Sequence, residues 1–182
     1  MRKTTLFGLA SVLVLVAAVL AQQTPAATGK VKLSVENAAL DLKAADKTQT
    51  AVSGSAEASL APGVYTPAKL VLSKRQVKED AGKKQESQWT LSSRGPWGGL
   101  GKITVTAGET TVVKLGEPLT IKTDPTEGED GAMTIGLRVV GTGGEVYAPY
   151  AAKDGKPVAV PPKITIVDEA AKVLATGSFQ FG

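Results

Sequence analysis

The chain has 182 residues, with 21 basic and 17 acidic side chains and neither histidine nor cysteine. Without histidine and cysteine, the chain has no hydrolase site built on a histidine base, no disulfide scaffold and none of the usual zinc ligands. The net charge of +4, which falls to +2 without Arg2 and Lys3, gives no support to the concentrated basic face that nucleic-acid binding needs.

Residues 1–21 have the composition of a secretory signal peptide. Arg2 and Lys3 precede an apolar run over 6–20, and small residues lie around Ala21. A positive start, an apolar stretch and a small-residue cleavage site, in that order, are typical of such signals. The alternative is an uncleaved membrane anchor, but the run of about 15 residues is shorter than the roughly 20 that a spanning helix needs. We therefore expect export to the periplasm or the exterior, with no membrane span in the mature chain.

After a short flexible lead over 22–29, the hydrophobic pattern has a period of two. Apolar residues alternate with polar ones, and Val, Ile and Thr are abundant, which is typical of half-buried β-strands. The segments that show this pattern are 31–35, 69–73, 88–92, 102–106, 111–113, 135–140 and 164–167. A helix is conceivable over 37–47, where alanine and leucine cluster. The sequence predicts an all-β protein.

Turn residues between these strands predict two hairpins. Ala107-Gly108-Glu109 joins two alternating runs closely, which predicts a hairpin over 102–115. The residues at 168–171 predict a second hairpin over 163–181.

A domain boundary is expected where Gly116-Glu117-Pro118 follows the first of these hairpins and precedes a new strand over 119–123. Short strands with frequent turn signals are typical of β-sandwiches. We expect two small immunoglobulin-like or prealbumin-like sandwiches, over 30–116 and 117–182.

Two segments share features with a known family. The first, 56–66, holds a Pro-Gly-x-Tyr step that ends at Tyr65, and the second, 103–115, holds a valine-rich strand, an Ala-Gly turn and a Thr-Thr strand. Together they resemble the carboxypeptidase regulatory-like domains of the wider prealbumin-like group. Over 30–116 the resemblance implies a seven-stranded sandwich without activity of its own, used as a spacer, stalk or binding module in exported proteins.

Two further stretches qualify this resemblance. The segment over 74–100 departs from it, because it is longer than the family's usual connection and contains its own strand around Trp89. The C-terminal segment over 164–177 resembles a terminal hairpin of bacterial exported proteins of unknown function, and this likeness implies no activity.

The glycine-rich run over 95–103 has the outline of a phosphate-binding loop but lacks its essential residues. Pro96 stands where the first glycine belongs, and Ile103 stands where Ser or Thr would bind magnesium. A turn between two strands is the better interpretation, and we expect no cofactor.

Four carboxylates lie close together along the chain, at Asp124, Glu127, Glu129 and Asp130. Carboxylate pairs can hydrolyse glycosides, and acidic loops can bind calcium. The spacing does not match the calcium-loop pattern, so we expect a solvated loop over 123–131 and no enzyme. Calcium binding by Asp124–Asp130 stays open.

The run over 74–84 holds five basic and two acidic residues. Mixed charges of this kind usually form a solvated loop, which is the favoured interpretation. The alternative is a patch that binds anionic wall polymers or lipid headgroups.

Aromatic residues supply the remaining candidates for a site. Trp89 alternates with polar neighbours and is expected in the core. Trp97 lies in a glycine-flanked loop, where it could cap the open end of a sandwich or stack on a sugar ring. Tyr147 and Tyr150 flank a second loop and could join Trp97 if the two loops meet.

We expect a non-catalytic structural or binding module of the cell envelope or its exterior, with envelope polysaccharide or a surface protein as a possible partner. The alternative is a carbohydrate-binding module whose loop aromatics Trp97, Tyr147 and Tyr150 contact the ligand.

Overall fold

The computed structural model describes residues 27–80, 82–158 and 160–180, so the predicted signal peptide at 1–21 and residues 22–26 of the lead lie outside the described residues. The all-β prediction is confirmed. The strands are β1 (Gly29–Leu33), β2 (Ala38–Lys43), β3 (Gln49–Ser53), β4 (Ala58–Leu60), β5 (Gly63–Asp80), β6 (Lys83–Ser93), β7 (Ile103–Val105), β8 (Thr110–Val113), β9 (Thr120–Glu127), β10 (Met133–Val140), β11 (Val146–Tyr147), β12 (Ala151–Lys153), β13 (Lys156–Val158), β14 (Lys163–Val167) and β15 (Val173–Ser178), and a 3-10 helix, η1 (Gly98–Gly101), precedes β7.

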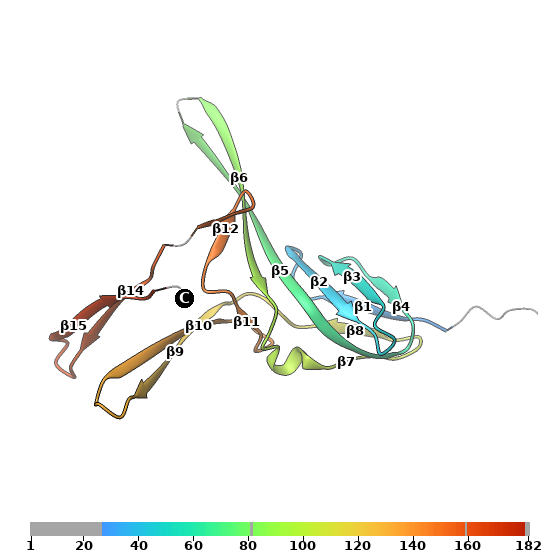
Figure 1. Ribbon diagram of the computed structural model, residues 1–182. Helices are drawn as coiled ribbons and strands as arrows, with labels where there is room; N and C mark the ends of the chain where they lie inside the picture. The colour runs from blue at the N-terminus through green and yellow to red at the C-terminus, as the bar shows by residue number, and fades with distance from the viewer. Residues whose placement is uncertain (1–26, 81, 159, 181–182) are drawn as a thin grey trace, which may run out of the picture.

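Two sheets pack face to face around one core (Figure 1). The first sheet has the order β4-β1-β8, and the second has the order β13-β12-β6-β5-β2-β3, with β7 also paired to β5. Each sheet turns alternate side chains inward, as the period of two predicts. The buried cluster that both sheets share includes Val31, Leu33, Leu40, Leu42, Val52, Leu60, Leu70, Leu72, Ile103, Val105 and Val113.

A bulge in β5 changes which residues face this core. Tyr65 and Pro67 are buried at the start of the strand, whereas Leu70 and Leu72 are buried further on. The register with β2 shifts at this point and leaves Ala68 without a partner. One extra residue in a strand moves the buried set from odd to even positions, so the alternation survives on both sides of the bulge.

The predicted hairpin over 102–115 is wrong. β7 pairs with β5 in one sheet, and β8 pairs in parallel with β1 in the other. The turn at 107–109 therefore carries the chain across the sandwich. Alternation reports which residues are buried, and it gives no sign of whether the next strand pairs alongside or crosses to the facing sheet.

Two other sequence-based predictions are settled by strand pairing. The conceivable helix over 37–47 is wrong, because 38–43 form β2, whose alternate residues Ala38, Leu40 and Leu42 are buried. The hairpin predicted over 163–181 is confirmed as far as Ser178.

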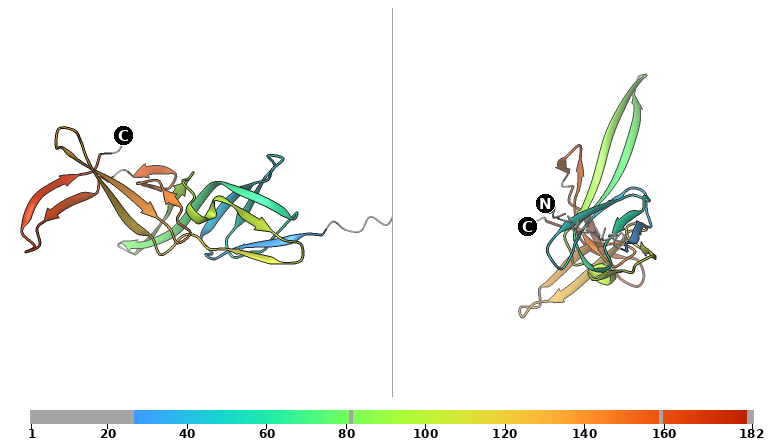
Figure 2. Two further views of the ribbon diagram at one scale, coloured as in Figure 1. Left: turned by 90° about the horizontal axis from the view of Figure 1, so that it is seen from below. Right: turned by 90° about the vertical axis from the view of Figure 1, so that its right-hand side faces the viewer.

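Three hairpins project from the sandwich (Figures 1 and 2). They are the distal part of β5–β6, then β9–β10, and then β14–β15. Their side chains are largely exposed, and every residue of β15 is exposed. The molecule is thus a small packed body with three exposed arms.

The chain beyond 116 returns to the first sandwich. β12 pairs with β6, and Tyr147 belongs to the same buried cluster as β1 and β2. Among the described apolar residues of 117–182, only Val140 and Tyr147 are buried. The division into two domains at residue 116 stays a prediction. Within the described ranges, no helix has the length and apolar character needed to cross a membrane.

Candidate functional site

The three predicted contact aromatics have different surroundings. Trp97 is half-buried and packs against the sandwich core, as the capping interpretation expects. Tyr147 is 3% exposed, whereas Tyr150 is 43% exposed. Tyr150 lines a hollow of about 290 Å³ that includes Phe179 and does not include Trp97. Burial leaves Tyr147 little surface for a ligand, and the joint role of these three residues stays a prediction.

The glycine-rich run lets two backbones meet. The Gly99 amide donates a hydrogen bond of 2.8 Å to the Gly143 carbonyl. Gly98 has a φ of 54°, and a Cβ placed there would lie 2.4 Å from the carbonyl oxygen of Gly144. Such an approach needs glycine, so packing between 98–99 and 143–144 accounts for this part of the run.

Glu145 is a buried polar residue that the sequence did not single out. It is 0% exposed, and its Oε1 accepts hydrogen bonds of 2.7 Å from the Gly116 amide and the Tyr147 hydroxyl. Its Oε2 has no hydrogen-bond partner in the structure. These bonds tie the segment after β8 to the start of β11.

Burial and the bond to Glu145 also affect Tyr147. Both raise the pKa of the Tyr147 hydroxyl above its ordinary value, because the phenolate would lose solvation and would face a carboxylate. Nearby, the Ser93 hydroxyl donates to the Val146 carbonyl at 2.5 Å. A lone glutamate after several glycines has the pattern of a solvated turn, so sequence alone offered no sign of this buried network.

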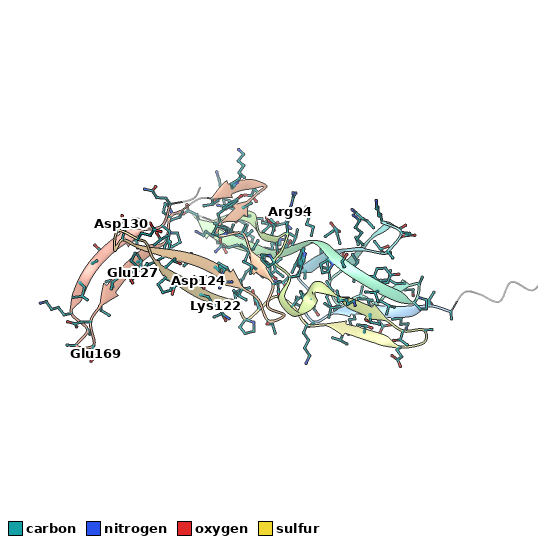
Figure 3. All side chains as sticks on the ribbon, turned by 60° about the horizontal axis from the view of Figure 1, so that its bottom comes forward. Arg94, Lys122, Asp124, Glu127, Asp130 and Glu169 are labelled. Atoms are coloured by element: carbon teal, nitrogen blue, oxygen red, sulfur yellow. The ribbon has the colours of Figure 1, made fainter. Side chains whose placement is uncertain are left out.

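The acidic residues predicted to share one loop lie partly on a strand. Asp124 belongs to β9, and its carboxylate accepts two hydrogen bonds of 2.6 Å from Arg138 on β10. Asp130 accepts from the Ala132 amide in the turn. Lys122, Asp124, Glu127 and Asp130 follow one another along the hairpin (Figure 3). No cluster of three or more potential metal-ligating side chains occurs in the part of the chain that the structure describes.

Trp89 lies outside the core, which corrects its expected place. Its ring is half-buried, and its Nε1 donates to Gln76 at 3.1 Å. The Nζ of Lys153 lies 5.8 Å from the ring centroid, within the range of a cation–π interaction. Trp89 closes one side of a small hollow of about 100 Å³, whose lining also includes Leu72, Lys74, Leu91, Glu117 and Leu119.

The run over 74–84 is a hairpin and not the predicted loop. β5 and β6 pair continuously from Leu70 with Ser93 to Asp80 with Lys83. The alternation weakens here because both faces of the hairpin meet water beyond the sandwich, so charged residues are accepted on either side.

Comparisons with known protein families, with curated proteins and with solved structures found no match. The class of protein is therefore described by the fold alone. The molecule is an all-β protein with one buried sandwich core and exposed hairpins.

Proposed function

We propose that the protein is a non-catalytic structural or binding module, exported to the cell envelope or the exterior. The observation that carries this proposal is the set of three exposed hairpins on one packed sandwich (Figure 2). Long strands that expose both faces offer a large contact area to an extended partner. The exposed surface of the three hairpins is not needed to bury the core, which favours a role for it in contact with a partner molecule.

The proposal includes the carboxypeptidase regulatory-like resemblance of residues 30–116. The structure has eight strands in this region, β1 to β8, where the resemblance implies seven. The additional length comes from the β5–β6 hairpin, which occupies the stretch over 74–93 where the sequence departs from the family pattern.

Export is tested by producing the full chain in a bacterial host and separating the cell fractions. We expect the protein in the periplasm or the medium, with Gln22 at its N-terminus by mass spectrometry. A Leu13→Arg variant, which interrupts the apolar run, serves as the control and should remain inside the cell. Retention of the uncleaved wild-type chain in the cytoplasm would overturn the proposal.

Carbohydrate binding by the loop aromatics is the second candidate. The exposure of Tyr150 beside Phe179 in one hollow favours it. If Tyr150 contacts sugar, Tyr150→Ala should reduce retention of the protein on envelope polysaccharide, and unchanged retention would remove Tyr150 from the site. Val112→Ala is the control, since Val112 is an exposed apolar side chain outside this hollow.

A further inference from the structure

Four strands of the large sheet place one tryptophan and three lysines in a single cross-strand row. Lys74 on β5 is opposite Trp89 on β6, Trp89 is opposite Lys153 on β12, and Lys153 is opposite Lys156 on β13. Residues directly opposite in antiparallel strands share a face of the sheet. Neighbouring strands are about 4.8 Å apart, so the row spans roughly 14 Å. We call Lys74, Trp89, Lys153 and Lys156 the lysine–tryptophan row.

This face continues the face that forms the core. On β5, Leu70 and Leu72 are buried in the sandwich, and the next residues of the same parity are Lys74, Gln76 and Lys78. Beyond Leu72 these side chains are exposed. The face of β5 that lines the sandwich interior as far as Leu72 is therefore exposed to solvent and basic from Lys74 onward. The half-buried indole of Trp89 lies where this change begins.

The positive charge of the row lacks ion-pair partners among the described residues. The three ion pairs found there are Lys30–Glu57, Arg75–Glu86 and Arg138–Asp124, and none includes a lysine of the row. Lys153 and Lys156 are directly opposite each other, an arrangement that is destabilising for like charges. An anion bound between them would remove this repulsion.

Two carboxylates, Asp154 and Glu117, lie beside the row and offset part of its charge, but neither forms an ion pair with its lysines in the described residues. Asp154 follows Lys153, but its Oδ1 accepts a hydrogen bond of 2.8 Å from the Gln88 amide. Glu117 lines the hollow beside Lys74. Asp80 has the same parity as Lys74 but lies at the far end of the hairpin, opposite Lys83.

The indole of Trp89 is held in one orientation at the centre of the row. Gln76 accepts from its Nε1, and Lys153 lies over its ring. Half of the residues that line the hollow beside it are apolar, among them Leu72, Leu91 and Leu119. A fixed aromatic ring with a polar edge suits stacking by a sugar ring, whose C–H face is apolar and whose rim carries hydroxyls.

We propose that the lysine–tryptophan row binds an anionic polysaccharide, with a sugar ring against Trp89 and acidic groups of the chain at the lysines. A polymer that repeats rings and negative charges satisfies both features over the span of a short oligosaccharide. A lipid surface satisfies only the charge, because the indole is half-buried and hydrogen-bonded and cannot insert into a bilayer. This inference rests on the proposed export, since such polymers lie in the envelope or outside the cell.

The test measures binding of the purified mature chain, from Gln22 onward, to polygalacturonate by titration calorimetry and tryptophan emission. The matched neutral probe is the same polymer with its carboxyl groups reduced. We expect binding to polygalacturonate alone, with a shift in emission. Binding should weaken as salt rises from about 0.01 M to about 0.15 M, because the screening length falls from about 30 Å to about 8 Å.

Variants locate the binding face. Lys156→Gln and Trp89→Ala should each weaken binding about tenfold, the loss that roughly 1.4 kcal/mol of binding free energy gives. Lys84→Gln is the matched control, because Lys84 is on the same hairpin but pairs with Glu79 on the opposite face. If Trp89→Ala fails to fold, the exposed pair Lys74→Gln and Lys156→Gln carries the test.

Four results would overturn the inference. They are no binding to polygalacturonate, equal binding to the reduced polymer, an equal loss in Lys84→Gln, or binding to vesicles with anionic lipid headgroups in place of the polymer. The experiment uses purified protein, so it is independent of cell fractionation. A chain that is exported but does not bind refutes only this inference, and a chain that binds but is not exported refutes only the proposed export.

Discussion

Tyr65 accounts physically for the Pro-Gly-x-Tyr step in the sequence. Its hydroxyl donates a hydrogen bond of 2.9 Å to the Ala61 carbonyl, and its ring is 6% exposed. The side chain thus closes the turn through Pro62 and Gly63 while its ring fills the core. At this scale the sequence was informative, because a proline, a glycine and a tyrosine in fixed order leave few ways to make the turn.

For Glu145, in contrast, nothing in the sequence indicated its role. Its substitution tests the buried network of Glu145, Tyr147 and the Gly116 amide. Glu145→Ala removes the acceptor for the Gly116 amide and the Tyr147 hydroxyl, so we expect the free energy of unfolding to fall by about 3 kcal/mol. Glu145→Gln keeps an acceptor oxygen at the same place and should cost much less. Urea denaturation measures both, and equal losses would show that the two hydrogen bonds are not the cause.

Tyr147 makes stability depend on pH in alkaline solution. Its folded-state pKa is raised by burial first and by the bond to Glu145 second, whereas the unfolded value is about 10. The neutral hydroxyl therefore contributes its full stability below pH about 10, and this contribution falls as pH rises toward the folded-state pKa. Tyr147→Phe should flatten this alkaline loss in urea denaturation, and an unchanged slope above pH about 10 would contradict the assignment.

At the scale of elements, strand positions were predictable but strand partners were not. The alternation at 31–35 and 69–73 reflects burial on one face, which each strand carries in its own sequence, whereas the alternating strand at 164–167 is largely exposed. Pairing depends on where a turn leads the chain, so the crossing at 107–109 was missed. The place of Trp89 was missed for a related reason, since its strand continues past the end of the facing sheet.

The ion pair between Arg138 and Asp124 predicts a pH response of the β9–β10 hairpin. The hydrogen bonds from Arg138 hold the pKa of Asp124 below its ordinary value. The stabilisation is present above the ordinary pKa of aspartate and is lost as pH falls through the lowered folded-state pKa. We expect amide chemical shifts on both strands to report this loss in an acid titration by NMR.

Asp124→Asn should abolish that acid response in the hairpin. Glu127→Gln is the control on the same strand, because Glu127 forms no ion pair in the described structure, and it should leave the response in place. An identical response in the Asp124→Asn variant would show that another group causes it.

At the scale of the whole molecule, the C-terminal arm should be dispensable for folding. β14 pairs with β15 alone, and every residue of β15 is exposed. Removing 163–182 should therefore change the thermal midpoint by less than about 4 °C, the shift expected for a change below about 1 kcal/mol in a domain of this size. Removing 150–182, which also takes β12 from β6, should lower it clearly. A large loss from the shorter truncation would indicate a contact of the arm with the sandwich.

The way the chain beyond residue 116 packs on the sandwich was the hardest feature to predict from the sequence. Gly116-Glu117-Pro118 has the composition of a boundary, and nothing in its sequence shows that the chain comes back. The return depends on Tyr147 entering the core and on β12 meeting β6, contacts that join residues far apart in sequence. Such contacts follow from packing of the whole chain and leave no local pattern.

The parallel pairing of β1 with β8 has a mechanical consequence. The register runs from Lys30 with Thr110 to Leu33 with Val113, so the start of β1 and the end of β8 lie at opposite ends of the strand pair. A pull on these two points slides the strands past each other, so their hydrogen bonds share the load instead of opening one by one. Strands loaded this way resist tension, and single-molecule stretching through handles at 29 and 116 should show a force peak that Lys32→Pro removes, because the amides of even-numbered β1 residues face β8 and proline cannot donate to the ladder. A peak that survives this substitution would place the resistance elsewhere.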